Sequence, residues 1–192
     1  MQTKQRQYTS EEYLALEEVA AFRSEYRDGE IVPMTGGSLN HNQIAGNVFA
    51  FLKFMLRKTQ TNPYIGDLRL WIPQYRQHTY PDVLVIQGTP TFKERRTDTV
   101  LNPCLIVEVL SASTKDYDRT DKFRYYRSIA ALQEYVLIDQ YAVGIEQYTK
   151  AEGDAWLFRS YDADVEEITF ASVDIEMPIQ DIYENVRFAP SA

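Results

Sequence analysis

The sequence predicts an α/β protein built around a mixed β-sheet, with helices on the sheet and an antiparallel meander at the C-terminal end. Residues 82–86 and 104–110 are almost continuously apolar, which is typical of strands that are covered on both faces. The strand–helix–strand order across residues 104–139 predicts a right-handed crossover and a parallel strand pair. Residues 143–169 instead alternate in polarity and contain turns, which predicts antiparallel strands that extend the sheet.

The N-terminal elements follow from local signals. Thr9 or Ser10 caps a helix that is expected to fade near Ala20. The Asp28-Gly29 pair lies between two short extended runs, which is a strong hairpin signal. Apolar residues then recur at helical spacing from Leu39 to Lys58 and predict the longest helix.

The remaining elements are shorter. Strands are expected at 64–66, 68–72 and 134–139, a polar connection at 88–103, a helix at 118–130 and a last short helix at 178–186. No Gly-, Pro- or Ser-rich linker divides the 192 residues, and 44% of them are hydrophobic. We therefore expect one domain that spans residues 1–192.

Charge and composition limit the classes of function. The net charge of −8 argues against a protein that coats nucleic acid without specificity, because such binding needs clustered lysine and arginine. Cys104, the only cysteine, is expected to be a buried thiol, and no apolar run reaches the length of a membrane span. The first residues lack the apolar segment of a signal peptide, so a cytoplasmic protein is expected.

Two acids occupy positions where burial makes acids costly. Asp82 opens one apolar strand, and Glu108 interrupts another. A buried carboxylate needs a hydrogen-bond network, a basic partner or a metal. If the strands are neighbours, both acids face one cleft and suit Mg²⁺; the alternative is that Glu108 pairs with Arg or Lys and Asp82 caps a turn.

Other polar residues offer weaker candidates. Lys122 lies at the border of an apolar helix face, where it points either to the strand ends or to a surface ion pair with Asp118. Glu25 follows the first helix and is able to reach a metal from the side, whereas Glu30 and Asp67 are expected to be solvated. His41 and His78 are too far apart in sequence for a spacing-based metal motif, so His41 is taken as a polar residue at a helix start.

The order of these residues resembles the Uma-two (Uma2) family of restriction-endonuclease-like proteins. The resemblance covers nearly the whole chain. It rests on Tyr8-Thr9-x-Glu11-Glu12-Tyr13-Leu14, Glu25-Tyr26-x-Asp28-Gly29-Glu30-Ile31, His41-Asn42, Tyr80-Pro81-Asp82-Val83, Asn102-Pro103, Ile106-Val107-Glu108-Val109-Leu110-Ser111-x-Ser113-Thr114, Asp118-Arg119-x-x-Lys122-Phe123-x-x-Tyr126 and Leu132-Gln133-Glu134-Tyr135-Val136-Leu137-Ile138-Asp139.

The resemblance implies a restriction-endonuclease-like fold and a PD-(D/E)XK site that hydrolyses phosphodiester bonds of DNA with Mg²⁺ or Mn²⁺. Asp82, Glu108 and the Val109 carbonyl are then metal ligands, and Glu25 completes the shell. The sequence departs from the motif because Val109-Leu110 stands where X-Lys is expected. The resemblance places the missing lysine on the following helix, where Lys122 fits. The alternative is a catalytically inactive binding or assembly protein with the same fold.

Partners are indicated only weakly by the sequence. Arg95, Arg96, Lys115 and Arg119 are candidate phosphate contacts near the expected cleft. The strand-rich segment 143–169 and the 14 tyrosines favour a homodimer surface. No sequence feature indicates a preference for a DNA sequence or for one strandedness.

Overall fold

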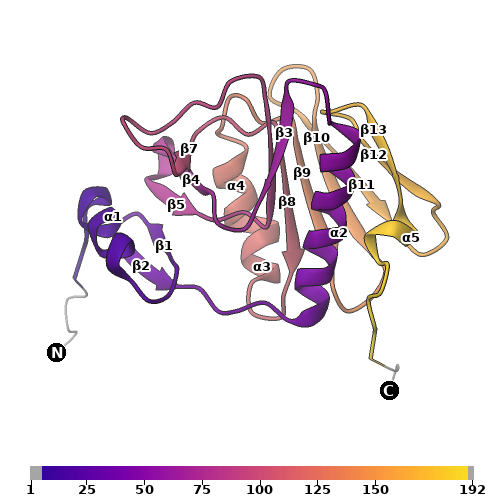
Figure 1. The fold of residues 1–192 in the computed structure, drawn as a ribbon, viewed down its shortest axis with the longest axis horizontal. Coiled ribbons are helices and arrows are strands. Elements are labelled where there is room, and N and C mark those ends of the chain that lie inside the picture. Colours follow the sequence, from indigo (N-terminus) through magenta and orange to yellow (C-terminus); the bar gives the residue numbers. More distant parts are fainter. Residues whose placement is uncertain (1–5, 190–192) are drawn as a thin grey trace.

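A computed structural model describes residues 6–189 of the chain, and it contains two larger β-sheets and a β-hairpin (Figure 1). The mixed α/β class and the antiparallel C-terminal strands are both confirmed. Within the described residues, no helix is both long enough and apolar enough to cross a membrane.

The six-stranded sheet forms the centre of the molecule, in the order β11-β10-β9-β8-β6-β3. Among the strands described for residues 6–189, β8 and β9 form the one parallel pair of this sheet, as the crossover rule predicts. The strands are β3 (Thr61–Ile65), β6 (Val83–Gln87), β8 (Leu105–Leu110), β9 (Glu134–Asp139), β10 (Ile145–Lys150) and β11 (Trp156–Tyr161).

The smaller, five-stranded sheet lies toward the N-terminal end, at the left of Figure 1, in the order β2-β1-β5-β4-β7. Its first hairpin turns at Asp28 and Gly29, which both have positive φ, as predicted from the Asp-Gly pair. The strands are β1 (Ser24–Arg27), β2 (Glu30–Pro33), β4 (Arg69–Ile72), β5 (Gln77–Thr79) and β7 (Thr99–Val100).

Helices cover both sheets. Helix α1 has a capping box in which Thr9 accepts a hydrogen bond from the Glu12 N–H and Glu12 accepts one from the Thr9 N–H. The helical segments are α1 (Ser10–Val19), α2 (Leu39–Met55), the 3₁₀-helix η1 (Pro73–Tyr75), α3 (Lys115–Tyr117), the π-helix η2 (Asp118–Lys122), α4 (Phe123–Tyr126) and α5 (Ile179–Ile182).

The hydrophobic core lies on both faces of the six-stranded sheet. On one face, α2, α5 and a hairpin of β12 (Glu167–Phe170) and β13 (Ile175–Pro178) bury residues such as Val48 and Phe170. On the other face, η2 and α4 pack against Tyr135, and Leu70 joins the same cluster from the five-stranded sheet. Strands β6, β8 and β9 are therefore buried on both sides, as their apolar runs predict.

Two expectations about the elements are wrong. The helix expected to reach residue 130 ends at Tyr126, and residues 127–132 form turns that still bury Ile129 and Leu132. The expected meander extends the sheet only with β10 and β11, because β12 pairs with β13 outside the main sheet. Strands β5, β7 and β13 are short and were not anticipated. Cys104 is buried, as expected.

Candidate active site

Asp82 and Glu108 lie side by side at one end of the neighbouring strands β6 and β8. The last antiparallel pair of these strands is Val83 with Val107, so the next residue on each strand lies at the same end. The Asp82 N–H lies 3.4 Å from Glu108 Oε2. Glu108 is only 4% exposed, whereas the Asp82 side chain is about one fifth exposed, at 21%.

Val109 links the two acids through its backbone. Its N–H donates to Asp82 Oδ2 over 2.8 Å. In a β-strand the N–H and carbonyl of one residue point to the same side, so the Val109 carbonyl also faces the side of Asp82. Three oxygen-bearing groups thus gather at the end of β6.

Lys122 reaches this pair from the helical segment that follows β8. Its Nζ lies 2.8 Å from Glu108 Oε1 and 3.2 Å from Asp118 Oδ1. The contact with Asp118 is the expected i,i+4 pair, but both side chains are buried, so it is not a surface ion pair.

The π-helix η2 sets the position of Lys122. A π-turn adds one residue to the helical turn and is frequent at functional sites. The Tyr135 hydroxyl donates to the Asp118 carbonyl over 3.1 Å and so satisfies a backbone acceptor within η2. The Tyr126 hydroxyl donates to Glu108 Oε1 over 2.6 Å. The role of Tyr126 was missed, although Asp118, Lys122 and Tyr126 repeat every four residues and so share one helix face.

His41 is the second residue that sequence reasoning undervalued. It lies in the first turn of α2, where its N–H donates to the capping Ser38 Oγ over 3.1 Å, and its Nε2 lies 3.2 Å from Asp82 Oδ2. Gly37 leaves room for the ring, since a Cβ at that position would lie 2.9 Å from His41 Nδ1. Burial alone would lower the pKa of His41, but the hydrogen bond and charge of Asp82 more than offset burial and raise it.

The acids and Lys122 strongly influence one another. Burial raises the pKa of Glu108; the charge of Lys122 opposes this shift, whereas the charges of Asp82 and Asp118 add to it. Burial would lower the pKa of Lys122, yet the surrounding acids, Glu108 first, raise it. Burial therefore disfavours the ionised form of Glu108, and a nearby positive charge such as that of Lys122 favours it.

Glu25 is near this group but does not contact Asp82 or Glu108. Its Oε1 accepts the Thr79 hydroxyl, and its Oε2 accepts from Arg27 over 2.6 Å and 3.1 Å. Burial acts to raise the pKa of Glu25, but the charge of Lys122, with Thr79 and Arg27, lowers it overall. The contacts thus occupy both carboxylate oxygens of Glu25.

The donor set fits a hard cation that needs few protein ligands. Among residues 6–189, no three His, Cys, Asp or Glu side chains are arranged to enclose a metal. Mg²⁺, however, takes one or two carboxylates and keeps several waters for a substrate phosphate to replace. Asp82, Glu108 and the Val109 carbonyl match that requirement, whereas a Zn²⁺ site would need more nitrogen or sulfur ligands.

The candidate phosphate contacts divide into two groups. Arg96 bonds Asp98 and Glu18, and Arg119 bonds Glu146, so these two guanidinium groups are already paired. Arg95 and Lys115 are exposed, and Lys115 follows the end of β8 closely.

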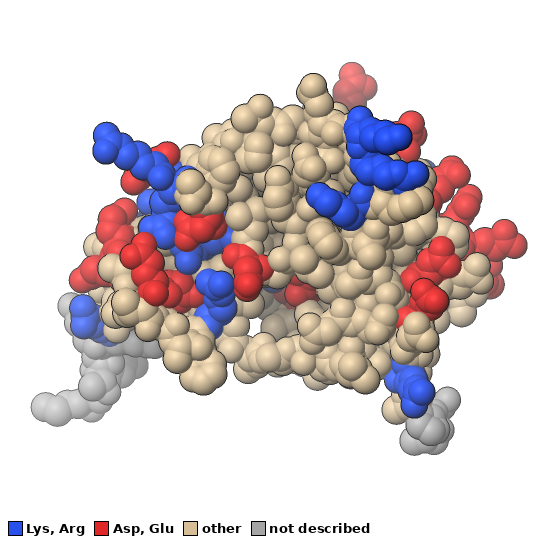
Figure 2. All heavy atoms as spheres, in the orientation of Figure 1, with Lys and Arg blue, Asp and Glu red and all other residues tan. Residues whose placement is uncertain are grey.

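Charge on the visible face is mixed. Figure 2 shows scattered acidic and basic groups, with acidic atoms near a recess at its lower centre, and no broad basic stripe. His78 is not part of the candidate site, since it is fully buried and stacks on Trp71 with ring centroids 4.2 Å apart. Glu30 and Asp67 are exposed, as expected.

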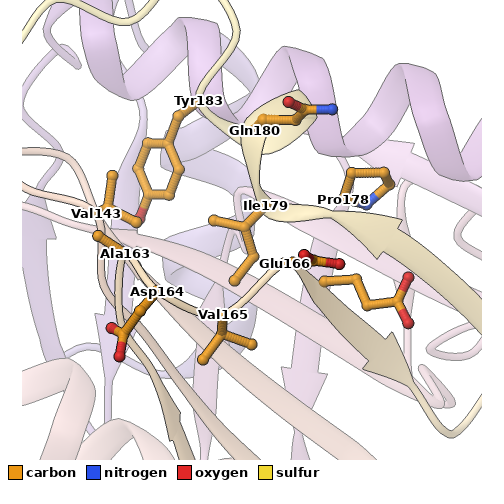
Figure 3. Close-up of a pocket in the computed structure, with 10 residues that line it drawn as sticks. Val143, Ala163, Asp164, Val165, Glu166, Pro178, Ile179, Gln180 and Tyr183 are labelled. Atoms are coloured by element: carbon orange, nitrogen blue, oxygen red, sulfur yellow. The ribbon is translucent and has the colours of Figure 1, made fainter.

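One cavity lies away from the acids. It measures about 570 Å³ and lies between the β11–β12 connection and α5. Figure 3 shows Asp164, Val165, Ile179 and Tyr183 around it. None of the candidate site residues lines this cavity, and its charged groups are all acidic, which does not suit a phosphate-bearing substrate.

Comparisons with known proteins identify relatives over most of the chain. The model of the Uma2 family, described as "Putative restriction endonuclease", matches residues 10–180. Two relatives come from Synechocystis sp., both described as uncharacterized. The protein sll1609 is 40% identical over 87% of this chain and 94% of its own length, and slr1290 is 35% identical over 93% and 92%.

A solved structure has the same fold. It comes from Anabaena variabilis and is described as a putative nuclease belonging to DUF820. Its TM-score is 0.75, with 17% identity, over 92% of this chain and 97% of that one. The restriction-endonuclease-like family expected from the motifs is confirmed by the match over residues 10–180. This chain belongs to the Uma2 family.

Proposed function

We propose that this protein is a Mg²⁺- or Mn²⁺-dependent endonuclease that hydrolyses phosphodiester bonds of DNA. The observation that carries the proposal is the convergence of Asp82, Glu108 and Lys122 from separate parts of the chain. The Asp82 N–H approaches Glu108 Oε2, and Lys122 Nζ contacts Glu108 Oε1. Val109, the neighbour of Glu108, donates its N–H to Asp82 Oδ2. Burying such a group is costly for folding, so its assembly favours a chemical role. Family membership supports the reaction class.

The ligands in this proposal are Asp82, Glu108 and the Val109 carbonyl. A divalent cation held there supplies polarisation of the scissile phosphate and a water of lowered pKa. Glu108 offers Oε2, which the Asp82 N–H approaches to 3.4 Å, while Oε1 stays bonded to Lys122. Metal binding through Oε2 would therefore leave the ion pair between Oε1 and Lys122 intact.

The remaining side chains orient and balance charge. Lys122 carries the positive charge that offsets the developing negative charge on the phosphate. His41 and the Val109 N–H both contact Asp82 Oδ2, which fixes the carboxylate and leaves Oδ1 for a metal in this proposal. Tyr126 fixes Glu108 in the same way by donating to Oε1, the oxygen that Lys122 also contacts. Lys115 and Arg95 are exposed cations that are able to contact DNA phosphates.

A non-catalytic binding or assembly protein is the second candidate function. The observation that favours it is that Lys122 and Tyr126 already satisfy Glu108 Oε1, as in a purely structural ion pair. Calorimetric titration with Mn²⁺ separates the two functions. Heat of binding that disappears in Asp82→Asn supports the nuclease, and the absence of binding to the wild type supports the second candidate.

The direct test is a cleavage panel on single- and double-stranded DNA and RNA with Mg²⁺, Mn²⁺ or EDTA. We expect metal-dependent cleavage of DNA that Asp82→Ala abolishes while the fold is retained. Asp67→Ala is the matched control, because the Asp67 side chain is exposed and its carboxylate pairs with Arg23. Cleavage by the Asp82→Ala protein at the wild-type rate would show that the activity comes from elsewhere.

A further inference from the structure

The edges of the two larger sheets are protected unequally. An exposed strand edge presents unpaired N–H and carbonyl groups, and proline or a very short strand normally prevents pairing there. Strand β3 contains Pro63, β2 contains Pro33, and β7 has only two residues. Strand β11 has six residues, no proline and one charged side chain, Arg159.

Strand β11 is also open to pairing along its outer side. It pairs with β10 over all six residues from Trp156 to Tyr161. In the part of the chain that the structure describes, no other strand is hydrogen-bonded to it. Leu157 is 56% exposed and Phe158 is 55% exposed, on opposite faces of the strand. The edge therefore offers both backbone groups and apolar surface.

An aromatic row crosses the sheet and stops at this edge. Tyr135 on β9, Tyr148 on β10 and Phe158 on β11 are cross-strand neighbours. Their ring centroids are 6.2 Å and 5.2 Å apart in turn, and Phe123 stacks on Tyr148 at 4.3 Å. Each inner ring thus has aromatic neighbours on both sides, whereas the outer side of Phe158 faces solvent.

We propose that β11 pairs with β11 of a second copy of this chain, antiparallel across a twofold axis, to form one continuous twelve-stranded sheet. An antiparallel edge is complementary to itself, and a twofold axis normal to the sheet requires one residue to face its own copy. Phe158 is that residue, because it continues the aromatic row into the partner. This inference concerns assembly and is independent of the proposed catalysis.

The surrounding residues suit a second copy of the chain. With Phe158 on the axis, Leu157 of each protomer lies opposite Arg159 of the other, on the same face of the sheet. The aliphatic stem of arginine is able to cover leucine while its charge stays in water. Although the chain has a net charge of −8, strand β11 carries no acidic residue. Pairing two copies along β11 therefore brings no carboxylates of this strand together.

The first test measures the mass of the intact protein by light scattering over a concentration series. The wild type is expected to have twice the chain mass of 22.3 kDa. Phe158→Lys is expected to shift the protein to the monomer, because a lysine on a strand edge opposes pairing. Phe54→Lys is the matched control, since Phe54 is 62% exposed on α2, and it should stay dimeric.

The second test places a cysteine on the axis. Opposed residues of an antiparallel pair have Cα atoms roughly 4.5–5.5 Å apart, which suits a disulfide. Phe158→Cys should form a disulfide-linked dimer on mild oxidation, while the buried Cys104 and a Phe54→Cys control should form none. A monomeric wild type, including one that binds an extended segment of another protein along β11, would overturn the proposal. So would a dimer that is insensitive to Phe158→Lys and not cross-linked through Cys at 158.

Discussion

Replacing Lys122 with methionine isolates the charge at the centre of the candidate site. Methionine retains most of the length and apolar surface of the lysine stem, so the main change is loss of the ammonium group. Lys122 is only 8% exposed, and its Nζ contacts the buried carboxylates of Glu108 and Asp118 at 2.8 Å and 3.2 Å. The variant leaves both acids buried without that partner.

The expected loss of stability follows from this burial. Removing one partner of a buried ion pair costs about 3–5 kcal/mol, because the remaining charge stays desolvated. With an unfolding entropy of about 2.1 cal/mol/K per residue, 192 residues convert this loss into a decrease of about 7–12 °C in Tm. A divalent cation bound to Glu108 replaces part of the lost charge, so Mn²⁺ should restore some of the stability.

The measurement is denaturant unfolding of wild type and Lys122→Met in EDTA and then in excess Mn²⁺. Lys115→Met is the matched control, because Lys115 is exposed, and its stability should change by less than about 0.5 kcal/mol. A Lys122→Met protein as stable as the wild type in EDTA would refute the buried ion pair. Equal destabilisation with and without Mn²⁺ would refute the idea that a cation takes over the charge balance.

Further expected outcomes concern two histidines and one turn. His41→Ala should weaken Mn²⁺ binding on the order of 10- to 100-fold in calorimetry, as for other groups that orient a metal ligand; an unchanged Kd would exclude this role for its contact with Asp82. Burial, with nearby cations, lowers the pKa of His78 to about 2, so the folded protein resists protonation and loses stability as pH falls below about 6.5, the unfolded value. Between pH 7 and pH 5 this loss is about 2 kcal/mol in denaturant unfolding, and His78→Phe should abolish it; an unchanged pH slope would contradict the buried neutral state. Gly29→Ala should cost about 1–3 kcal/mol, because φ is +104° there, and a wild-type Tm would contradict the strain.

The sequence predicted the location of the acids because an acidic residue inside an apolar run has few physical explanations. Asp82 and Glu108 were each conspicuous in apolar runs typical of buried strands, but whether those two strands are neighbours was left open until the structure showed β6 paired with β8. The assignment of Lys122 came from the family motif and not from periodicity, which left its direction open. The i,i+4 spacing of Asp118, Lys122 and Tyr126 would have supplied that direction.

Other features depend on contacts between residues far apart in the chain. His41 and Asp82 are separated by 41 positions, and no local pattern indicates that they meet. Alternation likewise cannot distinguish a strand of the main sheet from one in a packed hairpin. Strand β12 joins the hairpin, where the Thr169 carbonyl accepts from Gln147 and the Ser172 N–H donates to Glu134.

The early end of the helix has a different cause. Ile129 and Leu132 continue the apolar spacing and are buried, so the pattern predicts a helix through residue 130. Backbone bonds from Ile129 to Tyr126 and from Leu132 to Ile129 instead form successive turns. Side chains at i and i+3 reach the same core from such turns, and periodicity alone does not separate the two structures.

The proposed function requires Asp82 and Glu108 to hold a divalent cation. A crystal of the protein grown with Mn²⁺, with anomalous scattering recorded near the manganese edge, would show whether they do. We expect one strong anomalous peak within coordination distance of the Asp82 and Glu108 carboxylates and the Val109 carbonyl, and no such peak in Asp82→Asn. A crystal grown with saturating Mn²⁺ that shows no peak there, with Lys122 still bonded to Glu108, would contradict metal binding at this site.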